Sequence, residues 1–434
     1  MTDRALPGEA DVVIVGGGIV GCAAAYYLAR RGLRPLLLER GEVASQQSGR
    51  NWGFVRQQGR DPLEVPLMLE ANRIWRGLSA ELGTDVDWVQ GGNLALAATA
   101  ERMALFEGWL AVARQFGLDT RLLRGREIET VVPGIQGAWV GGMYTPSDGH
   151  AEPVTATRAI AGAATAHGAR IHSRCAARAI LTGGGAVTGL LTEQGEIRTT
   201  RVICAAGAWS APLVRTAGLS LPQRLVRATV ARTTPAPPVT RAGVWGPAVA
   251  FRQRPDGRLN LAAGGVTDYD VTLDAFRHLR LFLPNYWKNR QLFRFHVGRP
   301  LWRDLARLVP GSGRRRDPFT HDRDEEPPPN PDKVRRSLGE FQRLFPQLGG
   351  LAIERSWAGY IDVTPDAVPV LGEVPGRSGL VVATGFSGHG FAMGPIAGRL
   401  VAEIVLDGKP SLDLRGFRFS RFAEGATGQP HAVL

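Results

Sequence analysis

Short apolar runs separated by glycines begin the chain. The first run, Val-Val-Ile-Val at 12–15, is typical of a strand buried on both faces. An alanine-rich stretch at 22–31 predicts a buried helix that ends at Gly32, because glycine often follows a helix C-terminus. A second apolar run, 36–38, ends in Glu39. The pattern predicts a parallel strand–helix–strand unit at the start of an α/β domain.

Two kinds of pattern alternate further along the chain. Segments such as 88–97, 248–253 and 259–262 alternate apolar and polar positions, which is typical of antiparallel strands, whereas apolar strands and helices return elsewhere. We therefore predict an α/β fold, α+β overall, with a discontinuous Rossmann-type domain and a second domain built on a mainly antiparallel sheet. The first domain is expected at 1–87, 148–221 and 353–434, and the second at 88–147 and 222–352.

The glycines between the first strand and helix have the spacing G-x-G-x-x-G. Gly16 would make the tight turn, Gly18 would let a pyrophosphate approach the backbone, and Gly21 would let the helix pack closely. The helix start offers unpaired N–H groups to phosphates. Glu39 follows Gly16 by 23 residues and can hold a ribose diol. These features predict a dinucleotide site. The glycine run 183–185 opens no helix and predicts a hairpin turn, so a second nucleotide unit is not indicated.

Two distant segments complete a flavin site. Residues 201–207 predict a strand that runs into a glycine turn, and 379–384 predict a buried strand that enters the glycine-rich loop 385–394. A helix is expected at 395–406, because Pro395 suits a first helical position. The start of that helix can stabilise negative charge on a reduced flavin.

With these motifs the chain resembles the D-amino-acid oxidase-like FAD oxidoreductases, which include glycine oxidase, sarcosine oxidases and D-amino-acid dehydrogenases. The resemblance covers nearly the whole chain and rests on the glycine fingerprint, Ala-Ala-Gly207-Ala-Trp209, Trp357-Ala-Gly359 with Thr364-Pro365-Asp366, and the loop after 384. The segment 48–56 looks most like the β subunit of heterotetrameric sarcosine oxidase and similar opine oxidases. The resemblance implies FAD as the cofactor and makes the antiparallel domain the substrate domain.

Three departures from the family patterns are informative. Gly359 stands where monomeric sarcosine oxidase has the cysteine that attaches flavin. Asn51-Trp52-Gly53 stands where dimethylglycine dehydrogenase-like relatives have an attaching histidine after a tryptophan, so we expect non-covalent FAD. The strand at 259–267 lacks the lysine that activates oxygen in relatives, which puts oxygen in doubt as the acceptor.

Four side chains are candidates for contact with the substrate or the flavin. In similar sarcosine oxidases the arginine that matches Arg56 grips the substrate carboxylate, which suits a guanidinium fork; a solvated arginine is the alternative. His389 could stabilise the reduced flavin, although neighbouring backbone groups could do so alone. Tyr360 could point into the pocket. Arg252 lies on a predicted strand of the substrate domain, and a surface role is its simpler interpretation.

The residues expected to bind FAD lie in the fingerprint, the loop after Glu39 and the later glycine-rich segments. They are Gly16, Gly18, Ile19, Val20, Gly21, Glu39, Arg40, Ser48, Arg50, Asn51, Trp52, Gly53, Ala176, Ala206, Gly207, Trp209, Gly359, Gly385, Ser387, Gly388, His389, Gly390 and Phe391. For Asn51 a turn-stabilising role, and for Trp52 a packing role, are equally open. Asp366 is expected to cap a turn.

The amino-acid composition argues against nucleic-acid binding, disulfides and a metal site. The net charge of +12 over 434 residues comes almost entirely from arginine, a skew that accompanies abundant glycine and alanine and that we attribute to coding bias rather than to nucleic-acid binding. Three widely spaced cysteines and eight histidines without ligand spacing indicate neither disulfides nor a metal site. The apolar stretch 12–29 is explained by the Rossmann elements, and a cytoplasmic protein is expected, with a location at the inner membrane face left open.

The function predicted from the resemblance is FAD-dependent oxidation of the C–N bond of an amino acid or N-substituted amino acid, with the imine then hydrolysed. The expected substrate is a small amine that carries a carboxylate, and oligomerisation is left open. Oxidation of a 2-hydroxy acid or polyol phosphate is the first alternative, and a flavin subunit of a multi-component dehydrogenase is the second. A flavoprotein that acts on tRNA is a third, disfavoured because no appended domain is present.

The stretch 276–309 is the most cationic and aromatic in the chain. It is interpreted as one or two helices with aromatic side chains packed inward and arginines in solvent. The alternative is a docking surface for an anionic membrane or an electron-accepting partner. The charged, proline-rich segment 314–333 predicts an exposed loop, with a surface insertion favoured over a mobile lid.

Overall fold

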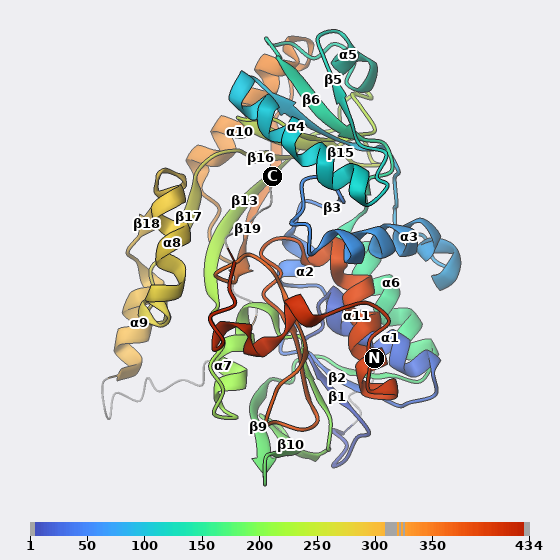
Figure 1. Cartoon of the computed structure of the whole chain (residues 1–434), viewed down its shortest axis with the longest axis vertical. Helices are drawn as coiled ribbons and strands as arrows, with labels where there is room; N and C mark the ends of the chain where they lie inside the picture. Colours follow the sequence, from blue (N-terminus) through green and yellow to red (C-terminus); the bar gives the residue numbers. More distant parts are fainter. Residues whose placement is uncertain (1–4, 309–318, 321–322, 324–325, 429–434) are drawn as a thin grey trace.

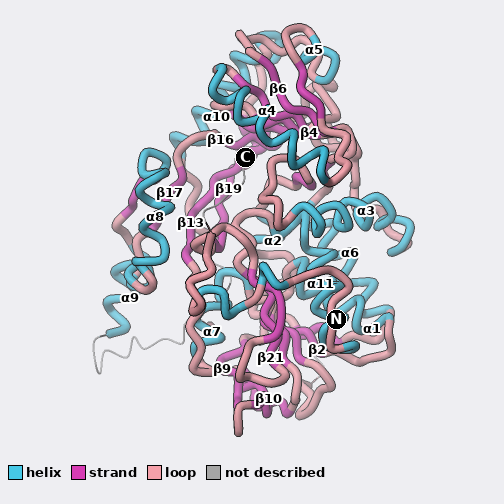
Figure 2. The backbone as a smooth tube through the Cα atoms, viewed as in Figure 1, coloured by secondary structure: helices cyan, strands magenta, loops and turns pink. Residues whose placement is uncertain are grey.

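The computed structural model describes residues 5–308, 319–320, 323 and 326–428, which form two connected domains (Figure 1). Strands dominate the middle of both domains and helices surround the lower one (Figure 2). Of the 314–333 segment, residues 314–318, 321–322 and 324–325 lie outside the described residues, and 331–333 begin a helix instead of continuing the expected loop. No helix in the described part of the chain is long and apolar enough to cross a membrane.

The described strands of the cofactor domain form a six-stranded sheet of order β20-β21-β12-β1-β2-β8. The strands are β20 (Val370–Glu373), β21 (Leu380–Thr384), β12 (Val202–Cys204), β1 (Val13–Val15), β2 (Leu36–Leu38) and β8 (Arg170–His172). All neighbours are parallel except β20, which is antiparallel to β21. The apolar runs form parallel strands because both faces of this sheet are covered. The predicted Rossmann-type arrangement is confirmed.

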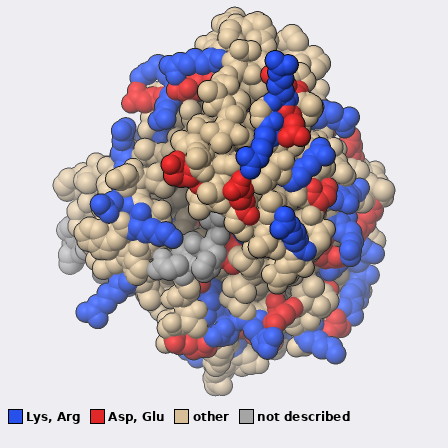
Figure 3. Space-filling model, turned by 45° about the horizontal axis from the view of Figure 1, so that its top comes forward, with Lys and Arg blue, Asp and Glu red and all other residues tan. Residues whose placement is uncertain are grey.

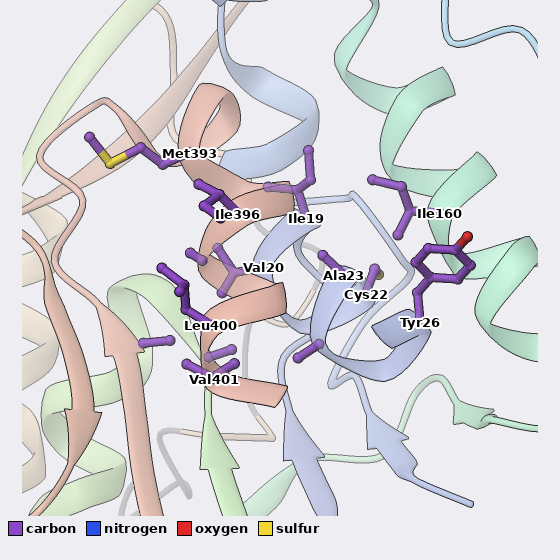
Figure 4. Close-up of a cluster of buried hydrophobic side chains, with 14 of the residues drawn as sticks. Ile19, Val20, Cys22, Ala23, Tyr26, Ile160, Met393, Ile396, Leu400 and Val401 are labelled. Carbon is purple, nitrogen blue, oxygen red and sulfur yellow. The ribbon is translucent and has the colours of Figure 1, made fainter. Parts of the chain in front are cut away.

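Helices cover one face of this sheet. They are α1 (Ile19–Arg30), α6 (Pro153–Ala166), α11 (Gly390–Asp407) and α3 (Val65–Leu82), with α2 (Gln47–Arg50) beside them. Side chains of α1 lie between those of α11 and α6, with Ile160 beside Tyr26 (Figure 4). A Cβ on Gly398 would lie 2.4 Å from Ala23 Cβ, so glycine permits the close packing of α11 on α1.

A small antiparallel sheet covers the other face. It consists of β9 (Ala177–Gly183), β10 (Ala186–Thr192) and β11 (Gly195–Arg198), and α7 (Ser210–Arg215) packs beside it. The turn between β9 and β10 contains Gly184 and Gly185, both with positive φ, so the predicted hairpin is confirmed. The domain therefore has three layers, with the nucleotide fingerprint at the carboxyl end of the central one.

The last helix differs from its prediction. It begins at Gly390 rather than at Pro395, which lies within its second turn. The proline removes one backbone donor and is tolerated this close to the helix start. The correction moves the helix N-terminus next to His389, in the glycine-rich loop itself.

The second domain contains a ten-stranded, mainly antiparallel sheet among the described strands. Its main path is β18 (Phe293–His296), β17 (Thr267–Asp270), β13 (Arg224–Thr233), β16 (Leu259–Ala263), β15 (Val249–Gln253), β14 (Gly243–Trp245), β4 (Asn93–Ala97), β6 (Gly141–Thr145) and β5 (Arg121–Leu123). The helices α10 (Pro331–Leu344), α4 (Ala100–Gln115) and α5 (Glu127–Val131) pack on it.

One domain boundary needs correction. The tenth strand, β19 (Ile353–Val363), pairs with β13 along its whole length, so 353–363 belong to the antiparallel sheet and not to the cofactor domain. The two-residue strands β3 (Phe54–Val55) and β7 (Gly149–His150), both in segments of the cofactor domain, pair with each other. The last part of β19 and the loop before β3 line the cofactor site.

The basic, aromatic stretch also differs from its simpler interpretation. It forms α8 (Leu279–Asn289), β18 and α9 (Arg299–Leu308), and Phe282 is buried as expected. Phe276, Trp287 and Trp302 instead are 63%, 60% and 65% exposed. The prediction that the aromatic side chains pack inward is therefore wrong for these three positions, which lie in the turn 273–276, in α8 and in α9, because no described element covers their side chains.

Candidate functional site

A long cavity opens at the carboxyl ends of β1, β2 and β12 and reaches β19 and the start of α11. Most of the side chains and glycines expected at the site line it. They are Gly16, Gly18, Ile19, Val20, Glu39, Arg40, Ser48, Arg50, Asn51, Trp52, Gly53, Arg56, Ala176, Ala206, Gly207, Trp209, Gly359, Tyr360, Ser387, Gly388, His389, Gly390 and Phe391. Gly21, Gly385 and Arg252 do not line it.

The glycine fingerprint forms the turn from β1 to α1. Gly16 has φ +114°, and a Cβ there would lie 2.3 Å from the backbone oxygen of Ala205. A Cβ on Gly21 would lie 2.0 Å from the backbone oxygen of Gly16, so Gly21 acts through close packing rather than by lining the cavity. Gly18 faces the cavity next to Ser48, whose Oγ accepts the N–H of Ile19 at 2.9 Å.

Glu39 fixes this turn as well as facing the cavity. Its Oε2 accepts the N–H of Gly17 and its Oε1 accepts the N–H of Gly41, each at 2.7 Å. Burial raises the pKa of the Glu39 carboxyl above its usual range, and the two backbone donors oppose that shift. Each carboxylate oxygen keeps a second lone pair that a ribose hydroxyl can use. The Arg40 guanidinium lies 3.6 Å from the centre of the Trp209 ring, also at the cavity wall.

These residues fit an FAD molecule. The N-terminus of α1 points free N–H groups and positive dipole into the cavity at Gly18, where a pyrophosphate needs both. Glu39 lies next to it at the position for a ribose. The N-terminus of α11 points at the other end of the same cavity, where it can stabilise negative charge on a flavin ring.

The sequence did not single out Gln47 or Asp362, which link the two ends of the cavity. Gln47 Nε2 donates to Asp362 Oδ1 at 2.7 Å, and Gln47 Oε1 accepts the N–H of Ala208 at 2.8 Å. Asp362 Oδ2 also accepts the N–H of Gly385 at 2.7 Å, so Gly385 supports the site from behind. Burial raises the pKa of the Asp362 carboxyl. The available signal was an acidic residue between two apolar ones, Ile361 and Val363, at the end of the strand.

Three aromatic side chains form a box at the substrate-domain end of the cavity. The ring centres of Trp52 and Trp245 lie 4.9 Å apart, and Phe54 lies 6.0 Å from Trp52 and 5.4 Å from Trp245. All three line the cavity. The guanidinium carbon of Arg56 lies 5.0 Å from the Trp245 ring centre, within cation–π range. Trp245 was not expected here, because the parallel pairing of β14 with β4 brings it from a distant segment.

Arg56 is buried, not solvated as its alternative interpretation would require. It is 3% exposed, and its Nη1 donates to the backbone oxygen of Gln58. Burial lowers the pKa of its guanidinium well below the usual value, and the neighbouring cation Arg60 adds to this effect. No carboxylate in the described part of the chain lies within ion-pair distance of Arg56. A buried cation of this kind favours an anionic ligand.

A second arginine, Arg60, lies beside it and also lines the cavity. It is buried; its Nε donates to the backbone oxygen of Arg56 at 3.1 Å, and its Nη1 has no hydrogen-bond partner among the described residues. Burial lowers the pKa of Arg60 as well. Arg60 could not be distinguished from other arginines in the sequence, because its burial depends on the fold of the loop after β3.

His389 faces the same end of the cavity. Its Nδ1 lies 3.1 Å from Oε1 of the buried Glu64. Burial lowers the pKa of His389 to about 4, with Arg60 as the next cause, so the imidazole is neutral near pH 7. A carboxylate can only accept in this contact, so the proton belongs on Nδ1 and the lone pair on Nε2. The neutral imidazole offers a hydrogen-bond acceptor at this end of the cavity rather than a positive charge.

Arg252 and Asn51 hold the loop from behind. Arg252 is fully buried, which overturns the surface role, and its Nη1 forms an ion pair with Glu152 at 2.8 Å. Its Nε donates to the backbone oxygen of Trp52. Asn51 Oδ1 accepts the N–H of Gly53 at 2.8 Å, which is the turn-stabilising role. Asp366 accepts the N–H of Val368 at 3.2 Å, consistent with the expected turn cap.

Comparisons with known proteins identify the family of the chain. The model of the family described as FAD dependent oxidoreductase (DAO) matches residues 11–404. Mitochondrial sarcosine dehydrogenase of Homo sapiens is 25% identical over 450 residues, which cover 99% of this chain and 43% of that protein. Glycine oxidase of Geobacillus kaustophilus is 27% identical over 420 residues, which cover 95% of this chain and 97% of that protein. The chain thus spans less than half of the first relative's length.

A solved structure is similar over almost the whole fold. The L-amino acid deaminase of Proteus myxofaciens in complex with anthranilate superimposes with a TM-score of 0.91 at 30% identity, over 97% of this chain and 95% of that one. Because the family model extends over most of the chain and the residues at both ends of the cavity fit FAD, this chain belongs to the DAO family of FAD-dependent oxidoreductases.

Proposed function

We propose that this enzyme oxidises the C–N bond of a small amine that carries a carboxylate, such as an amino acid or an N-substituted amino acid. In this reaction the substrate carbon gives up a hydride, which bound FAD would accept, the nitrogen loses a proton, and a C=N bond forms. Water then hydrolyses the imine to a carbonyl compound and an amine or ammonia. Bound FAD would supply the two-electron acceptor.

The observation that carries this proposal is the buried, unpaired guanidinium of Arg56 in the wall of the aromatic box. Its planar fork matches a carboxylate, and water is largely excluded from its surroundings. Binding there would hold the substrate carboxylate at one end and leave the rest of the substrate against Trp52, Phe54 and Trp245. Such positioning contributes to catalysis by fixing the reacting C–H bond.

The charges at this end of the cavity also favour an uncharged amine. Arg56 and Arg60 are both buried cations, so a substrate ammonium between them and the flavin would be destabilised relative to the neutral amine. His389 is neutral, and its Nε2 can accept a hydrogen bond from the amine N–H. An amine with a free lone pair is the form whose C–H bond can be oxidised by hydride loss.

The relatives support the class of reaction. The names of two of them, sarcosine dehydrogenase and glycine oxidase, describe oxidation of small amino acids, and a similar structure is of an L-amino acid deaminase. The substrates differ among these proteins. The relatives therefore support the class of reaction, whereas the substrate side chain, the substrate stereochemistry and the electron acceptor are questions for assays of this protein.

The test is a substitution of Arg56 in the FAD-loaded protein, assayed with an amino-acid and 2-hydroxy-acid panel and a dye acceptor. Arg56→Ala should raise KM for the best carboxylate substrate at least 30-fold, on the scale of a lost charge-assisted contact of about 2–3 kcal/mol. Arg56→Lys should recover only part of this loss, because an ammonium cannot form the same fork.

Arg73→Ala on the exposed side of α3 is the matched control and should leave KM unchanged. Flavin content should stay near that of the wild type in all variants. An unchanged KM in Arg56→Ala would contradict the proposal. Turnover of 2-hydroxy acids but not of amines would replace it with the first alternative reaction.

A further inference from the structure

We infer that residues 273–302 form a docking surface for an anionic lipid membrane. We call these residues the lateral unit. They comprise the turn Leu273–Phe276, α8, the turn Arg290–Leu292, β18 and the start of α9. The unit lies along one outer side of the molecule, next to β17 and β13 (Figure 1).

Exposed apolar side chains are concentrated in this unit. Seven of the eleven large hydrophobic side chains that are exposed in the described chain fall within 276–302. Phe276, Trp287, Val297 and Trp302 are the most exposed of them. Isolated exposed hydrophobic side chains are ordinary, whereas a group of this size on one projecting unit marks an interaction site.

Cationic side chains are interleaved with these apolar ones. Arg277, Arg280, Lys288, Arg290, Arg294 and Arg299 are all exposed. The sequence contains no Asp or Glu from 275 to 303. Over most of the rest of the face drawn in Figure 3, basic side chains are accompanied by acidic ones. Asp274, at the start of the lateral unit, forms an ion pair with Arg277 at 2.6 Å, and every other Asp, Glu, Lys or Arg of the unit is basic.

The inner side of the lateral unit packs against the rest of the protein, and these contacts fix the orientation of its exposed outer side. Phe282 is buried under the Arg224 guanidinium, which lies 4.2 Å from its ring centre. His296 Nε2 lies 2.8 Å from Oδ1 of Asp268, and Asp304 Oδ2 accepts the N–H of Leu273 at 3.1 Å. These contacts fasten α8, β18 and α9 to the edge of the large sheet while Trp287 and Trp302 stay in solvent.

This combination fits a lipid surface better than another protein. Tryptophan and phenylalanine insert at the boundary between headgroups and acyl chains, and arginine and lysine bind anionic headgroups at about 1 kcal/mol each. A second copy of this chain is disfavoured, because two such units facing each other would bring like charges together. An acidic protein would satisfy the cations but requires no group of exposed tryptophans, so we take the membrane as the occupant.

Sedimentation of the FAD-loaded protein with lipid vesicles tests this inference. We expect binding to vesicles that contain 30% phosphatidylserine at low salt, a loss of at least tenfold in partition coefficient at 0.5 M NaCl, and little binding to phosphatidylcholine vesicles. Trp287→Ser with Trp302→Ser should weaken binding to anionic vesicles at least tenfold. Lys288→Glu with Arg294→Glu should abolish its salt dependence and most of the binding.

Two control variants carry equal changes elsewhere on the surface. Leu105→Ser with Val140→Ser removes two exposed apolar side chains outside the unit, and Arg73→Glu with Arg415→Glu makes the same change in net charge. Both should bind like the wild type. Flavin absorbance should be unchanged in every variant, which separates loss of docking from loss of folding.

Absence of vesicle binding at low salt would overturn the inference and leave an acidic protein as the partner of the unit. Equal weakening by the control variants would also overturn it, because binding would then depend on net charge alone. The inference does not rest on the proposed reaction, since vesicle binding is measured without substrate.

Discussion

Arg252 and Glu152 form a buried ion pair, with Nη1 2.8 Å from Oε1, directly behind the loop that carries Trp52. A Cβ on Gly53 would lie 2.6 Å from Nη2 of the same guanidinium. The loop that carries Trp52 therefore packs directly on the Arg252 side chain, and position 53 must be a glycine because a larger side chain would clash with the guanidinium. Arg252 acts on the aromatic box through the backbone of Trp52 and not by facing the cavity.

This geometry predicts a structural effect for Arg252→Met. Loss of one partner of a buried pair should lower the free energy of unfolding by about 3 kcal/mol, measured by urea denaturation of the FAD-loaded protein. The effect on KM should be far smaller than that of Arg56→Ala. Arg254→Met removes the other, more exposed partner of Glu152 and should cost less stability. A large rise in KM with unchanged stability would instead make Arg252 the carboxylate anchor.

FAD should be released intact by acid precipitation. No cysteine lines the described cavity. Gly359 stands where monomeric sarcosine oxidase has the cysteine that attaches flavin, and a Cβ on Gly359 would lie 3.0 Å from Arg50 Cβ. The three cysteines are free and buried elsewhere. The measurement is flavin fluorescence in the supernatant and in the washed pellet. Yellow fluorescence that stays with the denatured polypeptide would show a covalent link, with His389 and Tyr360 as the residues to examine.

The phosphate turn should be sensitive to two substitutions in different ways. Gly18→Val should yield largely apo protein, because the side chain would occupy the space beside Ser48 where the pyrophosphate must approach. Glu39→Ala should weaken FAD binding by about 1–3 kcal/mol, or roughly 5- to 150-fold. Glu39→Gln keeps one acceptor for the two backbone N–H groups and should fall between. Reconstitution titrations with FAD measure all three, and unchanged affinity in each would remove FAD from this position.

The sequence predicted those parts of the site that depend on consecutive residues. Gly16, Gly18 and Glu39 belong to one strand–helix–strand unit, whose backbone geometry follows from local rules of turn and helix formation. The loop after β2 was also expected at the cavity, and Arg56 lies there. Local spacing is sufficient in these cases because the chain itself brings the residues together.

Residues that meet through distant pairing could not be predicted in this way. Gln47 and Asp362 are 315 positions apart and meet only because β19 crosses the domain junction. Trp245 reaches the aromatic box through the pairing of β14 with β4. The start of α11 was misplaced because Pro395 suits a first helical position, whereas packing against α1 extends the helix to Gly390.

Two buried histidines should each destabilise the folded protein as the pH is lowered from about 6.5 to 4. Burial lowers the pKa of His150 from 6.5 to about 3 and that of His389 to about 4. In this range the unfolded histidines bind protons that the folded ones do not, so each contributes a slope of about 1.4 kcal/mol per pH unit to the free energy of unfolding. Asp148, whose pKa is raised to about 6, and Glu39 and Asp362, whose pKa values burial also raises, bind protons more readily in the folded state and act in the opposite direction, so the contribution of one histidine has to be measured by substitution.

His150→Asn isolates this effect, because His150 contacts the backbone oxygen of Arg241 and does not line the cofactor cavity. Urea denaturation at pH 4.5, 5.5 and 6.5 should show a slope smaller than the wild-type slope by about 1.4 kcal/mol per pH unit. His167→Asn, at the end of α6 on the surface, is the matched control and should leave the slope unchanged. Parallel curves for wild type and His150→Asn would mean that His150 takes up its proton in the folded protein, with the buried Arg252 beside it tolerating a second cation.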